Sequence, residues 1–204
     1  EEKIPLLMGL LQQANNERCV VFINTKHMAE KIDAWLTANG FKCAMLSGDV
    51  PQKKRETLLQ RFKDGDVNVL IATDVAARGL HIPDVHFVVN FDLPGDAEDY
   101  VHRIGRTARA GASGTAMSLI CETYAMNIMD IEQFIEHTIP VERDIAELMF
   151  KDAVVPDLSN LKSNRKRDSR GKGGPKRDGK PTGGRSARPP RDGKPSRESK
   201  PSRD

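Results

Sequence analysis

The chain has 204 residues, and its charge is divided between two unlike parts. Residues 163–204 carry 15 Lys and Arg against 5 Asp and Glu, a net charge of +10, whereas the remainder carries 17 against 24, a net charge of −7. The apolar runs are too short for a membrane-spanning helix, so we expect no membrane partner. Three scattered cysteines argue against a disulfide framework or a zinc cluster. We therefore expect a cytoplasmic protein with no metal site.

Short β-branched runs alternate with segments of helical periodicity over the first 150 residues. The predicted strands are residues 19–24, 41–46, 67–72, 86–91 and 115–121, and the predicted helices are 3–14, 26–39, 51–64, 96–104 and 122–137. Pro51 at one helix start, and Gly40 and Gly65 just past two helix ends, support these boundaries. Most of the strands are apolar on both faces, so the pattern predicts one α/β domain with a mostly parallel sheet over residues 1–150.

The remaining residues, 151–204, differ in composition. Gly, Pro and Ser supply 19 of the last 42 residues, and RDGKP occurs both at 177–181 and at 191–195. Such a segment cannot bury enough apolar surface to offset the entropy lost on ordering. We therefore expect a disordered basic tail.

No glycine-rich phosphate loop follows a predicted strand. A near match, GPKRDGK at residues 174–180, has Pro181 where a magnesium-binding Ser or Thr is needed, and no strand precedes it. We interpret it as a chance match in a Gly- and Lys-rich tail. The chain therefore lacks a self-sufficient hydrolytic site.

A basic cluster, HRIGRTARAG, occupies residues 102–111, where Arg103, Arg106 and Arg109 recur at every third position. The cluster is either a solvated basic face or a platform of guanidinium groups directed at an anion. Guanidinium offers a planar fork of donors and keeps its charge, which suits phosphate. Two such arginines would reach the terminal phosphates of a nucleotide and stabilise charge that develops in phosphoryl transfer.

Two further loops follow predicted strands, at the edge where parallel sheets place ligands. In ATDVAARGLHI, residues 72–82, Thr73 and Asp74 are either a helix cap or a ligand contact. In SGDVPQKKR, residues 47–55, a Gly-Asp pair precedes a Gln and an Arg on the first turn of a helix. Helix N-termini bind phosphate, although Gln and Arg four residues apart are also ordinary on a helix surface.

Five segments together resemble motifs IV, IVa, V, Va and VI of the DEAD-box RNA helicases, in order and spacing. They are VVFINTK at 20–26, SGDVPQKKR at 47–55, ATDVAARGLHIPDV at 72–85, VVNFDLP at 88–94 and HRIGRTARAG at 102–111. The resemblance covers about residues 1–150 and implies the C-terminal RecA-like domain of such a helicase, a three-layer fold of the P-loop NTPase type. We expect the chain to be a fragment that is inactive alone, because the family's phosphate loop and Asp-Glu-Ala-Asp box lie on the other RecA-like domain.

The resemblance also implies roles for individual residues. Those matching catalytic positions are Arg106 and Arg109, the arginine fingers toward the ATP γ-phosphate, and His102, which couples the ATP and RNA sites. Those matching ATP-binding positions are His81, Arg106 and Arg109. Those matching RNA-backbone contacts are Thr25, Gly48, Gln52, Arg55, Thr73 and Asp74. Those matching the interdomain interface are Arg78 and Arg103.

Two positions depart from the family pattern. His81 stands where the family usually has an Asp that contacts the ATP ribose. Ala108 replaces a common Gly, which would restrict the loop if that position requires a positive φ.

Three functional hypotheses follow. The resemblance implies the C-terminal half of an ATP-dependent RNA helicase that unwinds short duplexes in RNA degradation, with ATP and Mg²⁺ bound mainly by the N-terminal RecA-like domain. Its implied partners are RNA, that N-terminal domain and an endoribonuclease scaffold of the RNA degradosome. The alternative is an RNA- and protein-binding module that docks on this scaffold while the tail holds RNA. The third is an unrelated α/β domain whose arginines form an ion-pair network.

Overall fold

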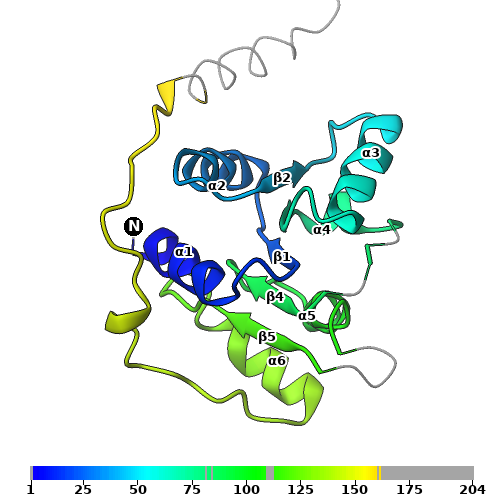
Figure 1. The fold of residues 1–204 in the computed structure, drawn as a ribbon. Coiled ribbons are helices and arrows are strands. Elements are labelled where there is room, and N and C mark those ends of the chain that lie inside the picture. The colour runs from blue at the N-terminus through cyan, green and yellow to red at the C-terminus, as the bar shows by residue number, and fades with distance from the viewer. Residues whose placement is uncertain (1, 81, 84, 109–112, 160, 162–204) are drawn as a thin grey trace, which may run out of the picture.

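The computed structural model describes residues 2–80, 82–83, 85–108, 113–159 and 161. Its sheet has the order β2-β3-β1-β4-β5, and every neighbouring pair is parallel (Figure 1). The strands are β1 (Cys19–Phe22), β2 (Cys43–Leu46), β3 (Val69–Ala72), β4 (Phe87–Asn90) and β5 (Thr115–Ser118). The predicted α/β class is confirmed, and each strand lies inside its predicted range.

The long helices also lie inside their predicted ranges: α1 (Lys3–Gln13), α2 (Lys26–Ala38), α3 (Gln52–Lys63), α5 (Ala97–Ile104) and α6 (Asn127–Ile135). Gly40 and Gly65 follow α2 and α3 with φ of +79° and +80°, a left-handed conformation that glycine adopts without strain. A four-residue helix, α4 (Asp74–Ala77), follows β3. The prediction was wrong at the start of α6, because hydrogen-bonded turns occupy the residues before Asn127.

The helices pack on two faces of the sheet because strand side chains alternate in direction. Val21 points into a core formed with α1 and α2, whereas Val20 and Phe22 point into a core formed with α3 and α4. A third cluster joins α5 to α6 through Tyr100 and Ile131. All the carboxyl ends of the parallel strands therefore meet at one edge, where the loops that carry the sequence motifs emerge.

Packing continues past α6 into a 3-10 turn, η1 (Ala146–Leu148), which the sequence did not predict. The Phe150 amide donates to the Pro5 carbonyl at 3.1 Å, and a Cβ at Gly9 would collide with the carbonyl of Leu148. Farther along, the side chain of Asn39 both donates to and accepts from the backbone of Val154, at 2.9 and 2.8 Å. The predicted tail beyond residue 161 lies outside the described residues.

Within the described residues, no helix combines the length and the apolar character needed to cross a membrane.

Candidate functional site

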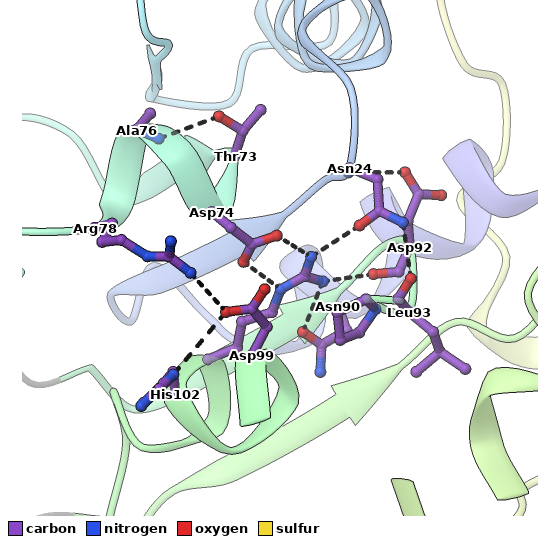
Figure 2. Close-up of polar contacts among 12 residues, drawn as sticks. Asn24, Thr73, Asp74, Ala76, Arg78, Asn90, Asp92, Leu93, Asp99 and His102 are labelled. Carbon is purple, nitrogen blue, oxygen red and sulfur yellow. Dashed lines mark hydrogen bonds and ion pairs between the residues drawn. The ribbon is translucent and has the colours of Figure 1, made fainter. Parts of the chain in front are cut away.

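One arginine, Arg103, is hydrogen-bonded to residues at the carboxyl ends of three strands, and Figure 2 shows its side-chain partners Asn24, Asp74 and Asn90. Arg103, on the last turn of α5, is 1% exposed. It donates through Nε and Nη2 to the two carboxylate oxygens of Asp74, at 2.7 and 2.6 Å. It also donates to Asn24 Oδ1 at 2.8 Å, to the Asp92 carbonyl at 2.6 Å and to Asn90 Oδ1 at 3.4 Å. Segments after β1, β3 and β4 are thereby joined to α5.

The guanidinium of Arg103 uses all five of its N–H donors in these contacts. Its Cζ also lies 5.3 Å from the centroid of the Phe22 ring, within cation–π range. A buried charge satisfied in this way holds the surrounding loops in a defined arrangement. The interdomain contact for Arg103 and the RNA contact for Asp74 stay predictions; in this structure the two side chains are directed at each other.

A second, exposed ion pair lies beside this network. Arg78 Nη2 donates to Asp99 Oδ1 at 3.2 Å, and His102 Nδ1 lies 4.0 Å from the same oxygen (Figure 2). The side chains of Arg78 and His102 are 77% and 72% exposed, whereas that of Asp99 is 29% exposed. With Arg106, these residues line a pocket of about 230 Å³ between α4 and α5. Asp74 and Arg103 also line it, so the pocket brings together five of the predicted site residues.

The backbone that carries Arg106 is anchored on both sides. Its amide donates to the Arg103 carbonyl at 3.1 Å, and its own carbonyl accepts from the Val85 amide at 3.1 Å. The Thr107 hydroxyl donates to the Val85 carbonyl at 2.6 Å. These bonds place the Arg106 side chain at the pocket on a rigid platform. Arg109 and His81 lie outside the described residues.

Ala108 follows this platform with φ of +55°. The position therefore does adopt the left-handed conformation that favours glycine, which disfavours other residues by about 1–2 kcal/mol. The condition stated from the sequence, a positive φ at this position, is met, and the restriction of the loop stays a prediction.

Two predicted RNA-contact residues act as helix caps. Thr25 Oγ1 accepts from the Met28 amide at 3.2 Å at the start of α2, and Thr73 Oγ1 accepts from the Ala76 amide at 3.4 Å at the start of α4. The capping interpretation of Thr73 is confirmed, and its ligand role stays a prediction. Both caps present helix N-termini at the carboxyl edge of the sheet, where amides suit phosphate oxygens.

The loop after β2 is shaped by Arg55. Its Nε donates to the Val50 carbonyl at 2.8 Å, and its Nη2 donates to the carbonyls of Gly48 and Ser47 at 2.9 and 3.2 Å. Gln52, one turn earlier on α3, donates to Glu56 Oε1 at 3.2 Å. Arg55 therefore orders the backbone of a predicted RNA-contact loop.

An ion pair joins this loop to the start of α2, between Lys26 Nζ and Asp49 Oδ2. Sequence reasoning assigned no role to Lys26, nor to Asn24, Asn90 and Asp99. Asn90 lies within an apolar run and Asn24 lies just after one, and this placement was the only sequence feature that marked them. Neither that placement nor an acidic residue on a short helix distinguishes an internal partner from a surface residue.

Comparison with known proteins decides the family. Residues 2–111 match the helicase conserved C-terminal domain. The crystal structure of the E. coli DEAD-box protein SrmB bound to the regulator of ribonuclease activity A is similar, with a TM-score of 0.68 and 42% identity, over 75% of this chain and 89% of that chain. The chain belongs to the DEAD-box helicases.

Other DEAD-box proteins support this membership. The ATP-dependent RNA helicase RhlB of Shewanella piezotolerans is 51% identical over 85% of this chain and 40% of its own length, and RhlB of Vibrio parahaemolyticus is 54% identical over 76% and 36%. S. cerevisiae Dbp5 bound to RNA and ADP BeF3 is similar with a TM-score of 0.61 and 34% identity, over 68% of this chain and 38% of that chain. This chain thus spans about two fifths of the length of the curated relatives, and its fold is the C-terminal RecA-like domain of a DEAD-box helicase.

Proposed function

We propose that the chain is the C-terminal half of an ATP-dependent RNA helicase that separates short RNA duplexes. The supporting observation is the pocket at the carboxyl edge of the sheet, where Arg78, His102 and Arg106 gather on a backbone held by Arg103. Guanidinium and imidazole groups on such a platform suit the phosphates of a nucleotide presented by a second domain.

ATP supplies the free energy for opening and closing the two domains, and the proposal assigns ATP and Mg²⁺ mainly to the N-terminal RecA-like domain. In this chain, Arg106 and Arg109 would approach the γ-phosphate, and His81 would approach the ribose. His102 would couple the nucleotide and RNA sites, and Arg78 would support the closed interface between the two domains. Asp99 accepts a hydrogen bond from Arg78 and lies 4.0 Å from His102, so it holds the Arg78 side chain beside the pocket.

The RNA backbone would lie along the loops that start α2, α3 and α4. The contacts are assigned to Thr25, Gly48, Gln52, Arg55, Thr73 and Asp74. Contacts to phosphate and sugar carry no base information, so binding would be independent of sequence, and the 2′-hydroxyl would distinguish RNA from DNA.

Arg55→Met in the full-length helicase tests the RNA face. Arg55 holds three loop carbonyls, at 2.8, 2.9 and 3.2 Å, so its loss should disorder the loop that carries Gly48. We expect the RNA concentration for half-maximal stimulation of ATP hydrolysis to rise about tenfold, equivalent to about 1.4 kcal/mol. The matched control is Arg61→Met, an exposed arginine on the same helix. Equal RNA dependence of the two variants would contradict the proposed face.

We also propose that the helicase acts in RNA degradation, docked on an endoribonuclease scaffold. The supporting comparison is the similarity to proteins named RhlB, and the structure of the related SrmB contains a protein partner, the regulator of ribonuclease activity A. The second candidate function is a binding module that docks through its folded domain and holds RNA with its tail. The division of charge favours it, since residues 1–162 have a net charge of −7 and residues 163–204 a net charge of +10.

Truncation after Leu161 separates the RNA-binding contributions of domain and tail. Because residues 163–204 hold 15 of the 32 Lys and Arg, we expect weaker RNA binding and a shallower dependence of the binding constant on salt. Fluorescence anisotropy with a labelled single-stranded RNA, measured over a range of salt concentrations, gives both quantities. Unchanged affinity and slope would exclude the tail as an RNA-binding element.

A further inference from the structure

The outer face of α6 carries large apolar side chains that lie outside the hydrophobic clusters of the described residues. Met126, Met129 and Phe134 are 73%, 63% and 52% exposed. The inner face of the same helix is occupied separately, because Ile131 is 1% exposed and packs in the cluster that joins α6 to α5. Single exposed apolar residues are ordinary on a protein surface, but three on one short helix form a local apolar surface.

Helical geometry brings these side chains together with acidic ones. Met126, Asp130 and Phe134 recur at every fourth position, so they form one ridge along the helix, and Met129 lies on the next ridge. Asp130 and Glu136 are exposed. We call Met126, Met129, Asp130, Phe134 and Glu136 the outer α6 face.

The segment that carries this face has acidic side chains and no Lys or Arg. Residues 122–137 contain four acidic side chains and no Lys or Arg, whereas the whole of residues 1–162 has a net charge of −7. More than half of the domain's excess negative charge is therefore concentrated on α6 and the turn before it. RNA is repelled by such a surface, so the face is not an extension of the proposed RNA site.

The basic tail of the chain has complementary charge but the wrong side chains. After Leu161 its apolar side chains are those of Ala187 and six prolines, so it offers no large aliphatic or aromatic side chain to pack on two methionines and a phenylalanine. An occupant must supply both positive charge and large apolar side chains. Methionine side chains are flexible and polarizable, and they adapt to apolar partners of varied shape.

We propose that the outer α6 face is a docking surface for a basic amphipathic helix of a protein partner. The apolar side of that helix packs on Met126, Met129 and Phe134, and its Lys or Arg side chains pair with Asp130 and Glu136. This mode is a helix laid against an apolar surface, with charge setting its orientation. This proposal rests on the proposed protein-binding function, and it states which surface binds the partner and which side chains the partner must supply.

The test uses the complete 204-residue chain and a labelled synthetic peptide of about 18 residues, with Leu on one helical face and Lys on the other. A second peptide has Ser in place of every Leu. Fluorescence anisotropy is expected to show at least about tenfold tighter binding of the Leu peptide, since only that peptide buries apolar area. The double variant Met129→Ser/Phe134→Ser is expected to lose about tenfold in affinity, and Asp130→Lys is expected to weaken binding through charge repulsion.

Val155→Ser is the matched control, because Val155 is 71% exposed but lies far along the chain from α6. It should bind the Leu peptide as the parent chain does, and circular dichroism should show all variants folded. Equal binding of the two peptides, or undiminished binding by the α6 variants, would overturn the proposal. Binding of labelled single-stranded RNA to the chain that is weakened by Met129→Ser/Phe134→Ser would do so too, by assigning the outer α6 face to RNA. RNA-stimulated ATP hydrolysis of the full-length helicase is measured separately, so failure of the docking proposal can be distinguished from failure of the helicase proposal.

Discussion

Arg103→Met is expected to lower the free energy of unfolding by about 3–5 kcal/mol, the range for breaking a buried ion pair by removing one partner. Arg103 is 1% exposed, and its loss leaves the Asp74 carboxylate and the side-chain oxygens of Asn24 and Asn90 without their donor. Urea denaturation of the chain, followed by circular dichroism, measures the change. Arg103→Lys keeps the charge but not the planar fork, so we expect a smaller loss of about 1–3 kcal/mol.

Arg143→Met is the control for this series, because Arg143 is an exposed arginine remote from the strand ends. It should change the free energy of unfolding by less than about 0.5 kcal/mol. If Arg103→Met is no more destabilising than Arg143→Met, the five hydrogen bonds do not hold the edge of the sheet together. Such a result would also remove the basis for treating Arg103 as the residue that positions the motif loops.

Local sequence pattern predicted the elements of this fold but not their order in the sheet. The runs at β1 and β3 are apolar on both faces, which identifies buried parallel strands, yet their pairing joins residues as distant as Cys19 and Val69. Alternation along a strand contains no information about which strand lies beside it. The η1 turn was missed for a related reason: contacts with α1 stabilise it, and no local periodicity marks it.

The sequence predicted which loops form the site, but it did not predict the direction in which each side chain points. Arg103 and Arg106 belong to one basic run, but α5 ends at Ile104, between them. Both residues line the pocket, but the last helical turn directs the Arg103 side chain at Asp74, whereas Arg106 follows the helix end. Spacing along the chain therefore located the cluster. It did not show that the Arg103 side chain is used in buried hydrogen bonds, because that follows from its place on the last helical turn. At Ala108 the family comparison did anticipate the backbone, since φ there is +55°.

Arg106→Ala in the full-length helicase is expected to reduce the turnover number for ATP about 10²–10³-fold while changing ATP affinity much less. The physical reason is that a donor directed at charge developing in the transition state contributes little to ground-state binding. RNA-stimulated phosphate release gives the turnover number, and fluorescence titration with a nucleotide analogue gives the affinity. The backbone of Arg106 is held through its own amide and carbonyl, each at 3.1 Å, so removing the side chain should leave the platform folded.

Arg106→Lys distinguishes a specific guanidinium contact from simple positive charge, because a Lys ammonium lacks the planar fork. We expect most of the turnover defect to persist in this variant. Equal losses of ATP affinity and turnover in Arg106→Ala would instead identify Arg106 as a uniform ATP-binding residue. Because Arg103 fixes the segment from which Arg106 projects, Arg103→Lys should lower turnover as well as stability, whereas Arg106→Ala should lower turnover alone. That difference would distinguish Arg103, which holds the backbone segment in place, from Arg106, whose side chain that segment carries.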